Sequence, residues 1–363
     1  MKPVEINQAL QRDVIGQGEA LRYVAVAIFK HLLGYPYGNL MLIGSSGTGK
    51  TTIMRSVERL YAEHDELQKY RVVVIMNANT FATEGGAIDT SRLFVRLEER
   101  ARRILGDDAD PQEIGEHMQH ATVCLDEIDK VSGMVGGKPY VTGLNIQQAL
   151  LTLIEGEKVD WTIEQTVRGE RRSTVVHLDT GKMLFFCGGA FEALYAQVFE
   201  RVTSPTSRVK LPTETVIVDD GRVQIREYFT LRHHFRQEDL FDYGMQPQFL
   251  SRFDNAIILE DLNPELLRHI FTDTRDSVFR ASHEFFQRYG IELEITPGAV
   301  KRIADEAARS PRIGARALKG VYGRIIKPFE YDPSTHVGAA GSDERPRLLI
   351  DEAVVRAALR PEA

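Results

Sequence analysis

Residues 40–51 read LMLIGSSGTGKT, an apolar run followed by a glycine-rich loop. Leu40–Ile43 has the length and composition of a buried β-strand, and a helical pattern that places Ile53 and Val57 on one face follows Lys50. A glycine-rich turn between a strand and a helix is the arrangement that phosphate-binding loops require. The stretch therefore predicts an α/β fold organised around a phosphate site.

The loop and the first residues of the helix supply the groups that bind a nucleotide's phosphates. Glycines allow successive backbone N–H groups to turn toward a phosphate, and the start of the helix adds positive partial charge. In such loops the lysine reaches the β- and γ-phosphates and the hydroxyl that follows it ligates Mg²⁺. We therefore expect ATP and Mg²⁺ as ligands, since the flanking strand and helix disfavour a glycine turn without a ligand. The predicted nucleotide-binding residues are Gly44, Ser45, Ser46, Gly47, Thr48, Gly49, Lys50, Thr51 (also a Mg²⁺ ligand) and Thr52.

A second candidate site follows the apolar run Val123–Leu125, which ends in the acids Asp126 and Glu127. A parallel sheet would bring these acids beside the phosphate loop. We expect Asp126 to hold Mg²⁺ and Glu127 to orient and polarise the attacking water. Solvated acids are common at strand ends, so this prediction depends on the loop that precedes the pair. Asp129 and Lys130 fit surface charges as well as they fit a catalytic role.

Short apolar runs alternate with helical patterns over residues 40–259, which is typical of a parallel sheet flanked by helices. Ile146, Leu150 and Leu153 share one face of such a helix. After the first strand, the further strands are expected at Val72–Met76, Thr122–Leu125, Met183–Cys187 and Ala256–Leu259.

The pattern changes near residue 261, where the apolar runs stop and helical periodicity takes over. Asn263 followed by Pro264 is typical of a helix start. We therefore predict a large nucleotide-binding domain over residues 1–261 and a smaller, mostly helical domain over residues 262–363.

Two segments interrupt this organisation. Residues 200–240 alternate in polarity around the turn Asp219–Gly221, which predicts a β-hairpin within an insertion over about 192–245. Residues 336–344 are rich in Gly, Ala and Ser and predict a mobile loop.

Composition narrows the class of protein. The 363 residues include 45 Lys and Arg against 52 Asp and Glu, and this net charge of −7 gives no basic excess for a nucleic-acid partner. The apolar runs are too short to cross a bilayer and the N-terminus lacks a secretory signal, so we expect a cytoplasmic protein without a membrane partner. The two cysteines, Cys124 and Cys187, exclude a four-cysteine zinc module and fit buried core residues.

Several strings resemble, in the same order, those of the Clp-type unfoldase ATPases, and most closely their ClpX-like branch. The resemblance covers about residues 13–350. It implies a P-loop AAA+ large domain and a small AAA+ domain that assemble as a homohexamer and act on a protein substrate or complex. The strings lie at Asp13–Gln17 (DVIGQ), Leu125–Val131 (LDEIDKV), Ile146–Gly156 (IQQALLTLIEG), Leu178–Phe191 (LDTGKMLFFCGGAF), Gln246–Phe253 (QPQFLSRF) and Gly314–Leu318 (GARAL).

The resemblance also implies roles for single residues. Val14 and Ile15 would pack on the adenine, and Arg252 would reach the nucleotide of a neighbouring subunit. Arg316 would contact the nucleotide from the small domain and couple its state to rotation between the domains. An arginine finger accelerates hydrolysis by about 10³–10⁵. Either arginine taken alone fits a solvated surface charge. Only the family-like strings around Arg252 and Arg316 favour the roles in contacting nucleotide. Cys187 occupies the place of the family's polar sensor residue.

The pore loop with which the family grips polypeptide departs from the family pattern here. Thr83–Asp89 keeps the family's glycines but has Ala87 where the family has tyrosine, which predicts a weaker pull on substrate. Ile88 still offers an apolar contact. Phe81 could replace the missing tyrosine as the gripping residue, but an aromatic residue of the core fits it better. Two further segments fit an additional pore loop and a solvated polar loop equally well. They are Lys138–Gly143 and the basic cluster of Arg168, Arg171 and Arg172.

Docking devices of the family are also missing. Residues 192–245 contain no Ile-Gly-Phe-like tripeptide, through which ClpX-type subunits dock on their peptidase, and the cysteine count implies no N-terminal zinc module. We therefore expect a remodelling ATPase that works without the usual Clp peptidase. A peptidase-linked unfoldase with another dock and a nucleotide-gated scaffold with slow hydrolysis remain open alternatives. A nucleic-acid motor has no support from the charge.

One histidine pair invites a metal-site interpretation. His233 and His234 stand near Glu238 and Asp239. Adjacent residues on a strand face opposite ways, so a solvated loop fits these residues better than a metal site does.

Overall fold

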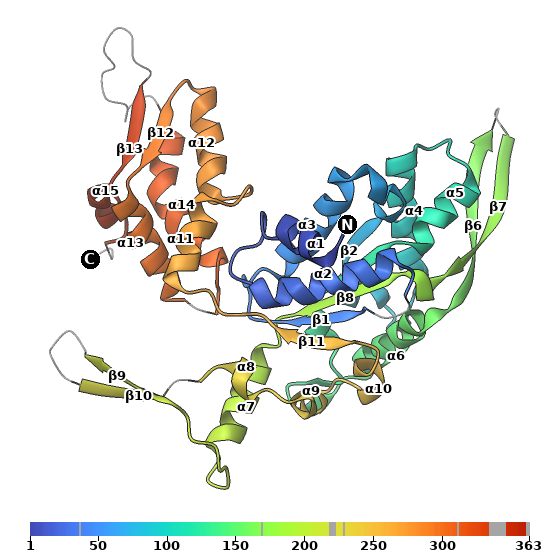
Figure 1. The fold of residues 1–363 in the computed structure, drawn as a ribbon, viewed down its shortest axis with the longest axis horizontal. Helices are drawn as coiled ribbons and strands as arrows, with labels where there is room; N and C mark the ends of the chain where they lie inside the picture. Colours follow the sequence, from blue (N-terminus) through green and yellow to red (C-terminus); the bar gives the residue numbers. More distant parts are fainter. Residues whose placement is uncertain are drawn as a thin grey trace. The chain divides into compact units, whose positions relative to one another are not determined.

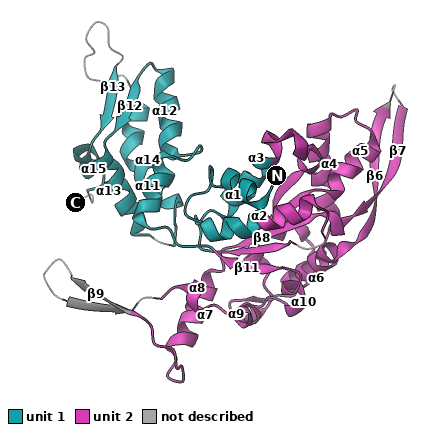
Figure 2. Ribbon diagram, in the orientation of Figure 1, with its two compact units in different colours: residues 1–25, 44–60, 259–363 teal, residues 26–43, 61–258 magenta. Residues whose placement is uncertain are grey.

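The chain forms two compact units, which Figure 2 colours separately. Unit 1 comprises Met1–Ala25, Gly44–Leu60 and Leu259–Ala363, and unit 2 comprises Val26–Ile43 and Tyr61–Ile258. Both are assembled from separate stretches of sequence, so the division into domains near residue 261 stays a prediction. The computed structural model describes residues 1–35, 38–167, 170–217, 223–227, 229–310, 312–333 and 346–360.

A five-stranded parallel sheet with the order β11-β1-β8-β3-β2 forms the centre of unit 2 (Figure 1). The predicted α/β fold is confirmed, and each predicted strand is present with ends shifted by at most one or two residues. Because all strands run the same way, their carboxyl ends share one edge, where Asn77 of β2 pairs with Asp126 of β3. The strands are β1 (Leu40–Ile43), β2 (Val73–Asn77), β3 (Thr122–Asp126), β8 (Leu184–Gly189) and β11 (Asn255–Ile258).

Helices of unit 2 share one apolar core with the strands of the sheet. The predicted face of α6 is confirmed, since Ile146, Leu150 and Leu153 are fully buried. They join the same core as Leu93 and Leu97 of α4. The helices before residue 260 are α1 (Pro3–Leu10), α2 (Gly18–Leu32), α3 (Lys50–Glu63), α4 (Ser91–Leu105), α5 (Pro111–Gln119), α6 (Val141–Gly156), α7 (Glu192–Thr203), α8 (Leu231–His234), α9 (Gln237–Tyr243) and α10 (Pro247–Leu250), with 3-10 turns η1 (Asp65–Tyr70), η2 (Ala78–Phe81), η3 (Ile128–Val131) and η4 (Thr180–Lys182).

Antiparallel hairpins contribute further strands to unit 2. The longest hairpin contacts α4, because Trp161 donates Nε1–H to Glu98 at 2.8 Å and its ring packs at a tilt against Phe94. The predicted hairpin of the insertion is confirmed, although its turn Asp219–Gly221 lies outside the described residues, as do Arg168 and residues 336–344. The hairpins pair β4 (Met134–Val135) with β5 (Lys138–Pro139), β6 (Lys158–Val167) with β7 (Glu170–Asp179), and β9 (Thr213–Ile217) with β10 (Val223–Glu227).

The chain beyond Leu259 is mostly helical and has an apolar core of its own. Asn263 caps α11 as predicted, since its Oδ1 accepts a hydrogen bond from Leu266 N at 2.8 Å. Helical periodicity does not reveal the parallel pair β12–β13, because β12 alternates charged with apolar side chains and β13 has only three apolar residues after Arg347. The elements are α11 (Pro264–Thr272), α12 (Val278–Arg288), β12 (Glu292–Ile295), α13 (Pro297–Ala308), α14 (Arg316–Tyr331), β13 (Arg347–Ile350) and α15 (Glu352–Ala358).

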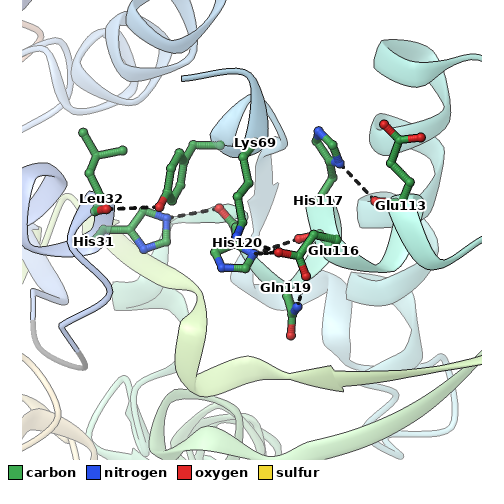
Figure 3. Close-up of polar contacts among 9 residues, drawn as sticks. His31, Leu32, Lys69, Glu113, Glu116, His117, Gln119 and His120 are labelled. Atoms are coloured by element: carbon green, nitrogen blue, oxygen red, sulfur yellow. Dashed lines mark hydrogen bonds and ion pairs between the residues drawn. The ribbon is translucent and has the colours of Figure 1, made fainter. Parts of the chain in front are cut away.

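Buried polar side chains join α2 to α5 within unit 2 (Figure 3). His31 Nε2 lies 3.1 Å from the carbonyl oxygen of His120, and the Tyr70 ring packs edge-on against both imidazoles. Beside them, Glu116 forms an ion pair with Lys69 at 2.6 Å. Burial lowers the pKa of His31 to about 4. This histidine is therefore neutral at pH 7 and donates its Nε2–H to the carbonyl.

Candidate functional site

The predicted phosphate loop leaves β1 at Gly44 and enters α3 at Lys50. Lys50 Nζ donates to the carbonyl oxygens of Gly44 at 2.5 Å and Ser45 at 3.0 Å, so the ammonium lies within the curve of the loop. Gly47 and Gly49 have φ of +75° and +105°, the left-handed region that favours glycine. A β-carbon on Gly49 would meet nothing within 4 Å, so this side of the loop has room for a ligand.

Arg316, at the start of α14, contacts this loop within unit 1. Its Nη1 donates to Ser46 Oγ at 2.6 Å, and Ala315 N donates to Gly47 O at 3.1 Å. Gly314 makes the approach possible, because it has φ of +55° and a β-carbon there would lie 2.8 Å from Ser46 O. The structure therefore brings the predicted Arg316 to the predicted phosphate site.

A pocket of about 670 Å³ opens beside the loop in unit 1. Buried Gln17 connects its wall to the loop, because Nε2 donates to Thr48 O at 3.0 Å and to Glu260 O at 2.9 Å. Glu260 N returns a hydrogen bond to Gln17 Oε1 at 2.9 Å, so both ends of the amide are used. The lining includes both residues expected to contact adenine, Val14 and Ile15, together with Gly16, Gln17, Gly18 and Leu266.

A carboxyl group also borders the loop. Asp261 Oδ1 accepts a hydrogen bond from Ser45 Oγ at 3.4 Å. Burial raises the pKa of Asp261 above its ordinary value, and the bond from Ser45 opposes this shift. A carboxyl that holds its proton more readily repels a neighbouring phosphate less than a fully ionised one does.

The predicted acidic strand end lies in unit 2. Asp126 Oδ1 accepts a hydrogen bond from Glu127 N at 2.9 Å. Glu127 has φ of 57° and ψ of 37°, a left-handed conformation that costs a non-glycine residue about 1–2 kcal/mol. Asn77, at the end of the neighbouring strand, donates its side-chain amide to Glu127 Oε2. The backbone and the amide together fix the direction of this carboxylate.

Arg252 lies just beyond α10 in unit 2, and its guanidinium pairs with Glu155 near the end of α6. Asn39 Nδ2 reaches the carbonyl oxygen of Arg252 at 3.5 Å. Both side chains of the ion pair are about two-fifths exposed, at 44% and 43%. The guanidinium is therefore held at the surface, where a neighbouring molecule can reach it.

Burial and pairing bear on the gripping, sensor and metal-site interpretations of several other residues. Phe81 is fully buried in the core and Ile88 packs against it, so neither offers an exposed gripping side chain. Cys187 is fully buried, and burial raises the pKa of its thiol. Asp239 pairs with Arg201 at 2.8 Å, and the described residues contain no cluster of His, Cys, Asp or Glu able to hold a metal ion.

Comparison with known proteins places this site in a family context. Residues 35–256 match the model of the AAA domain (Cdc48 subfamily). The chain is 28% identical over 348 residues to the "ATP-dependent Clp protease ATP-binding subunit ClpX" of Bacteroides fragilis, covering 91% of this chain and 77% of the relative. The proteins of that name from Azotobacter vinelandii and Porphyromonas gingivalis are 29% and 25% identical, covering 88% and 99% of this chain and 71% and 82% of theirs. None of the described helices is long and apolar enough to span a membrane.

Proposed function

The chain belongs to the AAA domain family (Cdc48 subfamily) and is an ATPase, and from this premise we propose that it forms a ring that hydrolyses Mg-ATP to remodel a protein substrate or complex without the usual Clp peptidase. The observation that carries the proposal is the contact of Arg316 with Ser46 in the phosphate loop. It joins the small-domain arginine to the loop, as a sensor of bound nucleotide requires.

The nucleotide fits the groups that unit 1 offers. Lys50 and the backbone N–H groups of the loop would hold the β- and γ-phosphates, and the pocket beside Val14 and Ile15 would hold the adenine. Thr51 and Asp126 would hold Mg²⁺, because a hydroxyl and a carboxylate are oxygen ligands of the kind that Mg²⁺ prefers. When bound, Mg²⁺ neutralises charge that develops on the transferring phosphoryl group.

Glu127 would accept a proton from the attacking water. Its left-handed backbone and its hydrogen bond from Asn77 would hold one carboxylate oxygen, which leaves Oε1 for the water. Arg252 would act on the nucleotide of a neighbouring subunit, because its side chain lies at the surface on Glu155. Hydrolysis would then depend on assembly, expected to be a hexamer.

The substrate class follows from the relatives, which are named as subunits of an ATP-dependent Clp protease. Independence from the peptidase is proposed because residues 192–245 lack a docking tripeptide and carry the hairpin β9–β10. Ala87 and the glycines before it, Gly85 and Gly86, are exposed and carry no large side chain, which favours remodelling over forceful threading.

The test uses Glu127→Gln, with the exposed Glu113→Gln as the matched control. We expect Glu127→Gln to bind ATP like the unchanged protein and to lose at least about 10²-fold in turnover, because it lacks the base. Turnover equal in both variants would contradict the mechanism. In ATP, the stalled Glu127→Gln ring should retain its substrate in a pull-down.

Two outcomes would favour the alternatives. Degradation of a tagged folded protein only when a compartmental peptidase is added would favour a peptidase-linked unfoldase. Slow turnover that never correlates with unfolding or extraction of a bound protein would favour a nucleotide-gated scaffold.

A further inference from the structure

Gln147 is a buried side chain of α6 whose amide is fully occupied by backbone groups of other segments. It is 0% exposed. Its Nε2 donates to Val131 O at 2.8 Å and to Gly244 O at 3.2 Å, and its Oε1 accepts from Gln246 N at 2.7 Å. Buried polar groups without partners are costly, so an apolar residue here would leave backbone groups of both segments unsatisfied.

The two segments that Gln147 joins lead to residues of the proposed site. Val131 ends η3, which begins directly after Glu127. Gln246 is the N-cap of α10, which ends just before Arg252. The amide therefore connects the backbone that follows the proposed base to the backbone that precedes the proposed arginine finger.

Direct contacts between these segments strengthen the connection. Gly133 N donates to Gly244 O at 2.8 Å, and Ser132 Oγ donates to Tyr243 O at 2.7 Å. Gly244 has φ of +104°, and a β-carbon there would lie 2.5 Å from Ser132 Oγ. The Gly244 carbonyl is thus shared by Gly133 and Gln147, and the segments have little freedom to slide past each other.

The same helix also holds the head group of Arg252. Glu155, eight residues after Gln147 on α6, pairs with the guanidinium. At 44% and 43% exposure this ion pair is weak by itself and does not fix the arginine. The buried hydrogen bonds of Gln147 fix the backbone from which the arginine extends.

We propose that Gln147 is a positioning residue for Arg252, holding the turn before α10 in register with the segment after Glu127 so that the guanidinium reaches the reacting phosphate. The inference rests on the proposed role of Arg252. It assigns Gln147 no contact with the nucleotide, so ATP binding should not depend on it. A purely structural glutamine would change stability without any link to Arg252.

The experiment is a double-mutant cycle in the full-length, assembled protein. Gln147→Met keeps the size of the side chain and removes its hydrogen bonds, and exposed Gln148→Met on the same helix is the control. We expect Gln147→Met to lower kcat about tenfold with KM for ATP changed less than about twofold, and Arg252→Ala to lower kcat by about 10³ or more. Adding Gln147→Met to Arg252→Ala should then change kcat less than about twofold, because residues that act through one another are not additive.

A second pair of variants tests the same link without changing Gln147. Gln246 has φ of −68°, which proline adopts, so Gln246→Pro fits the backbone, removes the N–H and places a ring carbon where that N–H meets Gln147 Oε1. Gln246→Ala keeps that N–H and is its reference. Gln246→Pro should reproduce the kinetic defect of Gln147→Met relative to Gln246→Ala. This comparison decides the case if Gln147→Met does not fold.

Each outcome has a defined meaning. Independent, multiplicative losses in the Gln147→Met and Arg252→Ala cycle overturn the positioning role and leave the proposed function intact. If Gln147→Met and Gln246→Pro both keep the kcat of the unchanged protein, the positioning role is also overturned and the proposed function stays intact. Wild-type turnover for Arg252→Ala overturns the arginine-finger part of the proposed function, and the role of Gln147 is overturned with it.

Discussion

Arg316 Nη1 lies 2.6 Å from Ser46 Oγ, so a helix far along the chain is bonded to the middle of the phosphate loop. Ala315 N adds a second bond to Gly47 O at 3.1 Å. Ser46 offers the guanidinium a neutral hydroxyl oxygen, whereas a phosphate would offer a charged oxygen. Charge-assisted hydrogen bonds are stronger than neutral ones, so bound phosphate should compete for the guanidinium.

Arg316→Ala should therefore weaken both nucleotide binding and turnover. Hydrogen bonds to charged groups contribute about 1.5–3 kcal/mol, which corresponds to about 10- to 150-fold in ATP affinity. The affinity is measured by titration in the Glu127→Gln background, where hydrolysis does not intervene. Ser46→Ala removes the hydroxyl that Arg316 contacts and keeps the loop's backbone N–H groups, so it should bind ATP within about threefold of the parent. Equal losses of ATP affinity in both variants would show that Arg316 acts through its contact with Ser46 and not through a contact with phosphate.

Asn77→Ala tests whether the amide orients the proposed base. The side chain donates to Glu127, and its loss frees a carboxylate that a left-handed backbone already constrains. We expect ATP affinity to stay unchanged and kcat to fall about tenfold, since one lost orienting hydrogen bond corresponds to about 1.4 kcal/mol. Asn79→Ala is the control, because only the backbone of Asn79 bonds to Asn77. Faster hydrolysis in Asn77→Ala would mean that the amide restrains Glu127.

The His31 cluster of Figure 3 predicts that stability depends on pH. The folded pKa of about 4 lies below the ordinary 6.5, so between these values the unfolded chain binds more protons. The stabilisation is complete above about pH 6.5 and is lost as the pH falls toward 4. From pH 7 to pH 5 the free energy of unfolding should drop by about 2 kcal/mol from this group.

Denaturant titrations at both pH values check the prediction. The pKa of His120 is also lowered, chiefly by burial, and changes stability in the same direction. His31→Gln can still donate to the His120 carbonyl but does not titrate. Its free energy of unfolding should therefore fall by about 2 kcal/mol less between pH 7 and pH 5 than that of the unchanged protein. Exposed His233→Gln is the control and should keep the full dependence. An unchanged slope in His31→Gln would contradict the assignment.

The parts of the site that the sequence predicts are those whose chemistry is local. The phosphate loop and the acidic strand end are continuous strings, and their strands are apolar runs of consecutive residues, so pattern alone predicts Lys50 and Glu127 as site residues. Asn77 is different, because its role depends on the register of β2 against β3 and its partner is 50 residues away. A polar residue at the end of the neighbouring parallel strand is the signal that could have revealed it.

Long-range amides are harder still to predict. Gln17 bonds to Glu260, 243 residues away, and Gln147 bonds to Gln246, 99 residues away. On a predicted helix, Gln147 differs from exposed Gln148 only by lying on the apolar face, and nothing local says which backbone groups it will meet. The strands of the β12–β13 pair escape prediction because neither is a continuous apolar run like β1: β12 alternates Glu with apolar residues and β13 begins with Arg347.

Asp239→Asn tests what holds α7 against α9 within the insertion. Asp239 is 2% exposed and receives both Arg201 Nε at 2.8 Å and Arg201 Nη2 at 2.9 Å, with Arg236 N at 2.7 Å. Replacing the carboxylate leaves the guanidinium without its charge partner, so we expect the free energy of unfolding to fall by about 2 kcal/mol in urea titrations, less than for a fully buried pair because Arg201 is partly exposed. Exposed Glu238→Gln is the control. ATP turnover per folded molecule should stay unchanged, and a selective loss of turnover with normal stability would place this pair in the site.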